Sequence, residues 1–270
     1  MTSQYGLYAY GLVGEIPEPL AIAGIDKKNN VYAVEGQGMR VMVSKIDIDT
    51  FQSQVKHVFS ELTKSTGTAQ SGTGALLQAH EDVVDTLMKS TTVVPFKFGT
   101  ILKDEEAASK MLREDEEKFK QLLARFTGRA EWGLKIYADT REFTQHIART
   151  EPQFKDMETQ REKLSRGAAY LLGRKMEEEL KNAVAARLAS VSGAIFQDLA
   201  KDSCEAKLNK TLPQKLTGRQ KEMILNTVYL VGRARVARFF RRGKSLREQY
   251  ASMGLDLEVS GPWPPYSFTD

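Results

Sequence analysis

Histidine and cysteine, the side chains that most readily serve as catalytic bases, nucleophiles or zinc ligands, are few in this chain and lie far apart. The sequence has three histidines, His57, His80 and His146, and one cysteine, Cys204. A zinc site needs three or four suitably spaced ligands, and a reactive thiol needs a nearby base or a Cys-x-x-Cys partner. The sequence therefore predicts no catalytic residue, no metal site and no cofactor, and it favours a hydrogen-bonded structural role for His80.

Two other patterns deserve comparison with known active sites. Residues 67–74 are rich in Gly, Ser and Thr, but they lack a Gly-Lys-Ser/Thr ending and join two expected helices, whereas a phosphate-binding loop joins a strand to a helix. The carboxylates Glu177, Glu178 and Glu179 have nothing nearby that would separate their pKa values, as an acid/base pair requires. We interpret the first as a connector and the second as a solvated patch.

The densest positive charge lies between residues 233 and 247, where the sequence has seven basic residues and no acid. Arg235, Arg238 and Arg242 stand at i, i+3 and i+7, so they share one flank of the expected helix. We take these three as candidate protein-docking residues, and a solvated face paired with nearby carboxylates is the alternative. Nucleic-acid binding is disfavoured, because the neighbouring aromatic residues have the helical spacing of a core.

The final ten residues, 261–270, combine three prolines with Trp263, Tyr266 and Phe268. Each proline ring fixes φ and removes an N–H, so we expect an extended, non-helical path. Exposed aromatic side chains would form an apolar patch. We predict that this tail docks on the protein's own surface and bridges two domains, and a free arm kept for a partner is the alternative. The tail-docking residues are Trp263, Pro264, Pro265, Tyr266 and Phe268.

One internal stretch, Val94-Pro-Phe-Lys-Phe-Gly99, has a related ambiguity. Pro95 within a strand-like run argues for an edge or a bulge, and Phe96 and Phe98 point to one face because side chains alternate along a strand. A core strand is the simpler interpretation. The functional alternative is an exposed edge that receives the tail or a partner.

Composition bounds the class of protein. The chain has 270 residues, 41% hydrophobic and 27% charged, with a formal net charge of +4. These values are typical of a globular protein with one large or two ordinary domains, and the mild charge does not by itself indicate nucleic acid. No apolar run approaches the roughly 20 residues of a membrane span. A start without signal-peptide features and a single cysteine fit a reducing cytoplasm.

The periodicity predicts an α+β fold in two domains. For residues 1–128 we expect strands at 5–13, 30–34, 39–46 and 93–102, helices beginning at Asp49 or Thr50 and near residue 75, a loop at 66–74, and a helix from Asp104 to Gly128. The 30–34 and 39–46 strands should form a hairpin around the glycines between them.

Residues 129–260 read as a second, ferredoxin-like domain with the order β-α-β-β-α-β, followed by the tail at 261–270. We expect strands at 131–138, 204–212, 222–231 and 256–260 and a helix at 233–253. A long helical region at 154–201 should be broken, because it would otherwise reach roughly 60 to 70 Å at 1.5 Å per residue. The candidate breaks are Ser190–Gly193 and Ser165–Gly167.

Six short motifs, taken in order along the chain, give the sequence a family resemblance. They are Tyr5-Gly-Leu-Tyr-Ala-Tyr-Gly11, Val93-Val-Pro-Phe-Lys-Phe-Gly-Thr100, Glu131-Trp-Gly-Leu-Lys-Ile136, Gly167-Ala-Ala-Tyr-Leu-Leu172, Asn226-Thr-Val-Tyr-Leu-Val231 and the ending Gly261-Pro-Trp-Pro-Pro-Tyr-Ser-Phe268. Together they resemble the gas vesicle protein F/L family (GvpF/GvpL), accessory proteins of protein-shelled gas compartments in some bacteria and archaea.

The resemblance implies a non-enzymatic structural or assembly role in gas vesicle formation. It implies the gas vesicle shell protein and other accessory proteins as partners, no nucleic acid or lipid membrane, and a location in the gas vesicle or the cytoplasm. Minor shell component and transient assembly factor both remain open. The rival hypothesis is a ferredoxin-like regulator that binds a small ligand or nucleic acid, because that fold hosts many functions.

Overall fold

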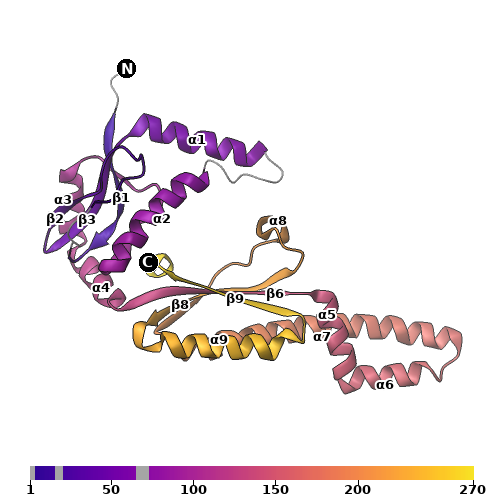
Figure 1. The fold of residues 1–270 in the computed structure, drawn as a ribbon. Helices are drawn as coiled ribbons and strands as arrows, with labels where there is room; N and C mark the ends of the chain where they lie inside the picture. The colour runs from indigo at the N-terminus through magenta and orange to yellow at the C-terminus, as the bar shows by residue number, and fades with distance from the viewer. Residues whose placement is uncertain (1–3, 16–20, 65–72) are drawn as a thin grey trace. The chain divides into compact units, whose positions relative to one another are not determined.

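The computed structural model describes residues 4–15, 21–64 and 73–270, with the backbone alone for residues 57–64 and 73. The fold mixes helices and antiparallel sheets in two compact units (Figure 1). Unit 1 contains residues 1–130 and 263–270, and unit 2 contains residues 131–262. The predicted connector at 66–74 lies almost entirely outside the described residues. No helix of the described segments is long and apolar enough to cross a membrane.

Unit 1 is built on one sheet with β1 near its centre. The strands are β1 (Tyr5–Val13), β2 (Tyr32–Gly36), β3 (Met39–Asp47), β4 (Val93–Pro95) and β5 (Ile101–Leu102). Their order is β2-β3-β1-β4, and β5 also pairs with β1. The predicted strand at the start of the chain and the hairpin after it are confirmed. All but the first residue of β1 are buried, which is the pattern of a strand covered on both faces.

Helices on both sides of this sheet explain that burial. They are α1 (Ile48–Lys64), α2 (Thr73–Ser90), α3 (Glu105–Glu114) and α4 (Glu116–Phe126). Tyr8 and Tyr10 of β1 pack in one core cluster with Val84 and Leu87 of α2. On the other side, α3 contacts β2 and β3, and α4 contacts β4.

Three local predictions for unit 1 were wrong in detail. The expected helix from Asp104 to residue 128 is two helices that meet at Asp115, although Asp104 does cap the first by accepting the Ala107 N–H. Helix α1 begins before Asp49, and Asp47 accepts the Thr50 N–H. The expected strand at 93–102 is interrupted, because Pro95 has no N–H to donate and Gly99 turns the chain with a positive φ of 86°.

Unit 2 has a four-stranded sheet in the order β7-β8-β6-β9. The strands are β6 (Arg129–Ala138), β7 (Glu205–Leu208), β8 (Glu222–Gly232) and β9 (Leu255–Trp263). The helices are α5 (Thr140–Thr150), α6 (Pro152–Arg161), α7 (Arg166–Ala200), α8 (Gln214–Thr217) and α9 (Val236–Ala251), and the 3₁₀ helix η1 (Arg233–Arg235) precedes α9. Residues from β6, β8, β9, α7 and α9 share one core, which includes Leu134, Ile195, Tyr229 and Phe239.

The long helical region is broken at one of the two predicted places. Helix α6 ends at Arg161 and α7 begins at Arg166, so the break adjoins Ser165–Gly167. The alternative break at Ser190–Gly193 was wrong, because α7 runs through it. Glycine costs a helix about 1 kcal/mol relative to alanine, and the burial of Val191 and Ile195 in the core offsets this cost.

Two further strand and tail predictions need correction. The strand expected at 204–212 ends at Leu208, and Asn209 makes one more backbone bond to β8 through its N–H to the Asn226 carbonyl. The tail was expected to be extended throughout, but a 3₁₀ helix, η2 (Tyr266–Phe268), follows Pro265. A 3₁₀ turn tolerates this position because the prolines precede it, where a missing N–H removes no helical bond.

Candidate functional sites

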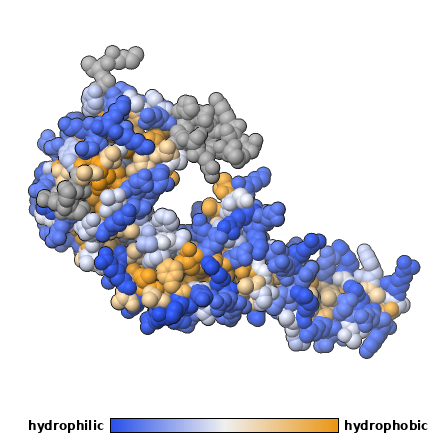
Figure 2. Space-filling view, in the orientation of Figure 1, coloured by the Kyte–Doolittle hydropathy of each residue, from blue (hydrophilic) through white to orange (hydrophobic). Residues whose placement is uncertain are grey.

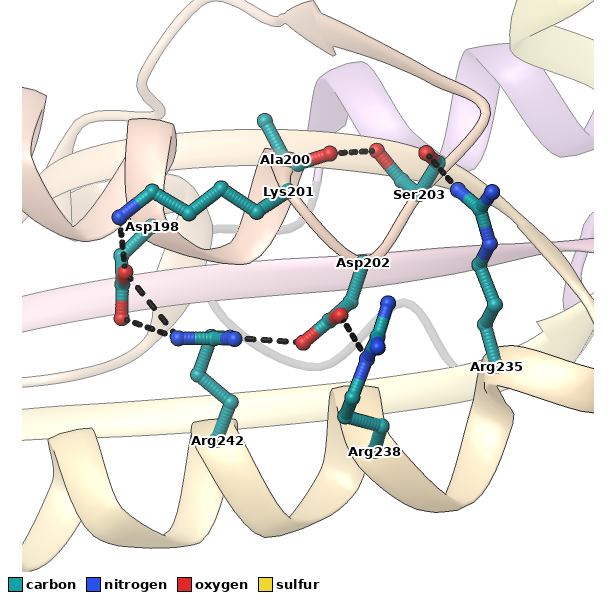
Figure 3. A network of polar contacts seen from close by, with 8 residues as sticks. All are labelled: Asp198, Ala200, Lys201, Asp202, Ser203, Arg235, Arg238 and Arg242. Atoms are coloured by element: carbon teal, nitrogen blue, oxygen red, sulfur yellow. Dashed lines mark hydrogen bonds and ion pairs between the residues drawn. The ribbon is translucent and has the colours of Figure 1, made fainter.

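The first candidate site is the basic helix α9 with η1 before it, both in unit 2. Its local sequence forms an amphipathic helix: Phe239 and Leu246 are buried in the unit's core, and most of the basic side chains lie on the other sides. Sequence reasoning placed Arg235, Arg238 and Arg242 on one flank of this helix. The structure brings all three against the end of α7 (Figure 3).

The acidic partners of these arginines are Asp198 and Asp202. Asp202 follows α7, and its side chain is only 1% exposed. Its Oδ2 accepts a hydrogen bond from Arg242 Nε at 2.7 Å, and its Oδ1 forms an ion pair with Arg238. Arg242 Nη1 also lies 3.2 Å from both carboxylate oxygens of Asp198, which in turn binds Lys201 Nζ at 2.7 Å. The cluster thus joins the end of α7 to α9.

The remaining arginine of the predicted trio binds backbone. Arg235 Nη1 donates to the Ser203 carbonyl oxygen at 3.2 Å, in the turn after α7. The bond gives a partner to a carbonyl just beyond the helix end, where no further helical turn follows to donate an N–H. All three predicted docking residues therefore have partners inside unit 2.

The electrostatics of this cluster follow from its pairing. Burial raises the pKa of Asp202, but hydrogen bonds from Arg242 and Arg238 outweigh burial, so its pKa lies below its ordinary value. The pKa of Asp198 is lowered chiefly by its bond to Lys201 and also by Arg242. Both carboxylates are ionised at neutral pH, and both charges are matched by cations within the unit.

Other basic residues of this stretch keep their charge available. In the described part of the chain, the side chains of Arg233 and Arg241 make no ion pair, and Lys244 has only a long contact of 3.9 Å to Glu248, with both side chains well exposed. The sequence does show matching spacing, because Asp198 and Asp202 are spaced i, i+4, as are the two arginines that pair with them, Arg238 and Arg242. Nothing local, however, indicated that α7 and α9 lie side by side.

The second candidate site is the C-terminal segment, 263–270, which belongs to unit 1. Phe268 is fully buried, and Pro264 and Pro265 are buried beside it, whereas Trp263 is 45% exposed. Arg125 Nη1 of α4 donates to the Phe268 carbonyl oxygen at 3.0 Å. The segment therefore packs through its prolines and its last aromatic residue.

Tyr266 connects this segment to a buried histidine on α2. Its hydroxyl lies 2.9 Å from Nε2 of His80, which is completely buried. Nδ1 of His80 lies 3.0 Å from the Tyr8 hydroxyl, and that hydroxyl accepts the Gly99 N–H at 3.0 Å. The ring of Tyr10 stacks on the imidazole, with centroids 5.8 Å apart.

These bonds have one consistent direction. The Tyr266 hydroxyl also bonds to the Glu81 carboxylate, and a carboxylate accepts protons rather than donating them. The Tyr266 oxygen then accepts from Nε2–H of His80, and Nδ1 accepts from Tyr8. A neutral imidazole supplies this combination of one donor and one acceptor.

Burial keeps His80, Tyr8 and Tyr266 neutral at physiological pH. Burial lowers the pKa of His80 to about 4, against a smaller opposing effect of the Phe96 backbone. Burial also raises the pKa values of Tyr8 and Tyr266 above their ordinary value, and it raises that of Glu81. These shifts oppose proton transfer near pH 7, so the chain of bonds fits a structural connection better than acid/base chemistry.

The stretch 94–99 lies close to the end of the tail. A groove of about 280 Å³ in unit 1 is lined by Phe96 and Lys97 from this stretch, by Phe119 of α4, and by Thr269 and Asp270 of the tail. Val94 and Pro95 are buried, and Phe96 is partly buried.

The other sequence candidates stay apart. His146 lies on α5, and Cys204 is exposed after α7. His57 lies on α1, where only the backbone is described. Within the described residues, no group of three or more His, Cys, Asp and Glu side chains could hold a metal ion. Glu177 and Glu179 form exposed pairs with Arg174 and Lys175.

Known proteins resemble this chain along nearly its whole length. The family described as "Gas vesicle synthesis protein GvpL/GvpF" matches residues 6–270. Gas vesicle protein L of Streptomyces sp. (strain CB03234) is 27% identical over 191 residues, which cover 71% of this chain and 67% of that protein. Gas vesicle protein L1 of Halobacterium salinarum is 24% identical over 275 residues, which cover 99% of this chain and 91% of that protein.

A solved structure has the same fold. The crystal structure of the gas vesicle protein GvpF from Anabaena sp. PCC7120 superposes with a TM-score of 0.70, at 21% identity, over 100% of this chain and 99% of that one.

Proposed function

Because this chain belongs to the GvpL/GvpF family of gas vesicle proteins, we propose that it is a non-enzymatic structural or assembly protein of gas vesicles. In this role it binds the shell protein or other accessory proteins while the vesicle forms. The family match over residues 6–270 is the observation that carries the proposal. It also favours the gas vesicle and the cytoplasm as locations, and it gives no reason to expect a lipid membrane or nucleic acid as a partner.

The architecture of unit 2 supports a binding role. Its strand order β7-β8-β6-β9, with helical segments between β6 and β7 and between β8 and β9, is the order expected of a ferredoxin-like sandwich. Such a sheet-and-helix layer presents surfaces without requiring a catalytic residue. We therefore take unit 2 as a ferredoxin-like scaffold that carries docking surfaces.

The basic helix α9 is one such surface in this proposal. Arg235, Arg238 and Arg242 fix it to the end of α7, which leaves Arg241 and Arg233 to face a partner. Unpaired surface cations steer association with acidic surfaces and weaken with added salt. Binding through this helix should therefore be salt-sensitive.

The tail supports the proposal as an internal connection. The chain leaves unit 1 after residue 130 and returns to it at residue 263. The packing of Phe268 and Tyr266 within unit 1 therefore holds the returning segment in place. Release of this segment would expose apolar surface and remove the part of the groove wall that Thr269 and Asp270 form beside Phe96. We propose that the docked tail maintains the form of the protein that awaits its partners.

Deletion of the gene in a vesicle-forming cell tests the proposal, with gas-filled particles scored by microscopy. We expect their loss and their return on complementation with the full chain. Normal particles in the deletion strain would contradict an assembly role. Co-purification separates the rival class: recovery of vesicle proteins supports the proposal, and recovery of a nucleotide or RNA in their place supports a ferredoxin-like regulator.

A further inference from the structure

The free end of the helical hairpin α6–α7 lies away from the core of unit 2. Figure 1 shows α6 and α7 extending together beyond the sheet. Every buried residue of α7 lies at Val184 or later, and in α6 only Phe154 is buried. The turn between the helices and the first turns of α7 therefore contribute nothing to the core cluster, and their sequence is free to serve another purpose.

Large apolar side chains cluster at this end. Leu164 is 45% exposed, Tyr170 68% and Leu171 69%. Figure 2 shows orange atoms among the blue ones along this hairpin. A soluble surface normally scatters such residues singly, and a group of them marks an interaction site. These residues also fall in or beside the motif 167–172, which the proposed function did not use. We call residues 163–171 the hairpin tip.

A glycine, Gly167, lies at an open position in the middle of the tip. Gly167 precedes Tyr170 and Leu171 by three and four residues, so all three share the outer side of α7. A Cβ added at Gly167 would have no atom within 4 Å, so internal packing does not require glycine here. Glycine is a poor helix former, and its use at an open position fits close approach of another chain.

Basic side chains outnumber acidic ones at this end of the hairpin. Residues 161–175 include five basic side chains and one acidic side chain. Arg161, Arg174 and Lys175 pair with Glu158, Glu177 and Glu179, respectively. Lys163 and Arg166 of the tip make no ion pair with any residue that the structure describes. The apolar group is thus flanked by two unpaired cations.

We propose that the hairpin tip is a docking surface for an acidic amphipathic helix of a partner protein. The apolar stripe of that helix covers Tyr170 and Leu171 and approaches closely at Gly167, and its carboxylates face Lys163 and Arg166. A helix is the matching shape, because a ridge of large side chains beside a small residue packs into the groove of another helix. The inference deepens the proposed function and rests on its claim that the protein binds other proteins.

Two other occupants fit the tip less well. A second copy of the tip would bring like charges together, because both copies carry Lys163 and Arg166. An anionic lipid surface would also meet Glu162 and the acidic run 177–179, which lie within a few turns of the tip. An apolar and acidic helix matches both the exposed side chains and the unpaired cations. Few large side chains are involved, so the contact is weaker than one burying the roughly 800 Å² per partner of a standard complex.

Fluorescence anisotropy on the full chain tests this inference. The probe is a labelled synthetic peptide of about five helical turns, with a leucine stripe flanked by glutamates. Tyr170→Ala with Leu171→Ala should weaken binding about tenfold or more, since truncated central anchors carry most of the affinity. The matched control, Leu208→Ala with Leu216→Ala, removes two exposed leucines elsewhere in unit 2 and should leave binding unchanged. Circular dichroism checks that both variants fold.

A charge exchange and a glycine pair sharpen the test. Lys163→Glu with Arg166→Glu should abolish binding of the glutamate-flanked peptide and create binding of a lysine-flanked one. Gly167→Ala should weaken binding while the helix stays intact, and Gly193→Ala, at an equally open glycine of α7, should not.

Full peptide binding by the folded Tyr170→Ala, Leu171→Ala variant would overturn the proposal, as would an equal loss in the leucine control. Two other results would replace the helix with a different occupant: tip-dependent binding to vesicles of phosphatidylcholine and phosphatidylglycerol without peptide binding, or a dimer in sedimentation that the variant abolishes. The peptide assay contains no gas vesicle, so its failure is distinguishable from failure of the deletion and complementation experiment.

Discussion

Removal of the Phe268 ring should destabilise unit 1 far more than its position near the chain end suggests. Phe268 is completely buried, and truncation of a buried Phe to Ala typically costs about 3–5 kcal/mol. A domain's whole free energy of unfolding is about 5–15 kcal/mol. Phe268→Ala should therefore remove a large part of the stability of unit 1. The Arg125 bond goes to the Phe268 backbone, so it survives only while the segment stays docked.

The measurement must distinguish the two units, because a chain of two units need not unfold in one step. Hydrogen exchange read by mass spectrometry does so. We expect faster exchange in peptides from β1 and α2 of unit 1 in Phe268→Ala. Peptides from β8 and α9 of unit 2 should keep their wild-type rates.

Trp263 provides a matched aromatic residue in the same segment. It is 45% exposed, so Trp263→Ala leaves a smaller part of the side chain's contacts unfilled and should cost less than Phe268→Ala, because the cost of truncation grows with the apolar area and volume lost from the interior. Unchanged exchange in unit 1 of Phe268→Ala would refute the reasoning. Equal losses in the two variants would also refute it, because they would show that the segment acts as a whole and not through its buried ring.

Four more predictions concern the buried polar groups and α9. Tyr266→Phe leaves Nε2 of His80 without its acceptor and should lower the free energy of unfolding by about 1–3 kcal/mol in urea titrations. The pKa of His80 is about 4 in the folded state and ordinarily 6.5, so between these two pH values only the unfolded state takes up a proton. The free energy of unfolding should therefore fall as the pH drops through that range, and His80→Asn should abolish this part of the pH dependence. Asp202→Asn should cost about 1.5–3 kcal/mol of stability at neutral pH, because it removes a charged hydrogen-bond acceptor. Since the pKa of Asp202 lies below its ordinary 3.8, the wild-type protein should lose this stability as the pH falls below that value, and the variant should lack this loss. On α9, Arg241→Glu should reduce pull-down of acidic partners without changing the melting temperature, whereas Arg242→Glu should lower that temperature. The opposite pattern would contradict the assignment of Arg241 to partner binding and Arg242 to the internal ion pairs.

The elements that the sequence predicted well are those whose pattern is local. The strand at 5–13 and the hairpin after it were evident from alternating β-branched and aromatic residues with glycines between them, and β1 lies between two other strands as such a buried run requires. The interruption at Asp115 had no local signal, because the residues on both sides of it favour helix. Its cause is tertiary: α3 contacts β2 and β3, whereas α4 contacts β4.

The candidate sites show the same division. The tail's aromatic residues and prolines were recognisable, but His80 lies 186 residues before Tyr266, and no local pattern connects them. Likewise, the basic run had no acid within it, and the acids that pair with it come from the end of α7 and the turn after it, more than thirty residues earlier. Which long-range pairs meet depends on sheet order and helix packing, which a single sequence does not specify.

Charge density along a sequence and charge available on a surface are therefore different quantities. The run 233–247 is the most basic stretch of the chain, yet Asp198 and Asp202 neutralise part of it inside unit 2. The hairpin tip is less basic in sequence, but Lys163 and Arg166 have no ion-pair partner among the described residues, and exposed Tyr170 and Leu171 lie beside them. Since an interface draws its affinity from buried apolar anchors and its steering from unpaired charge, the tip meets both requirements, whereas α9 offers mainly the second. We therefore expect the basic helix to govern how fast a partner arrives, and the tip to govern how long it stays.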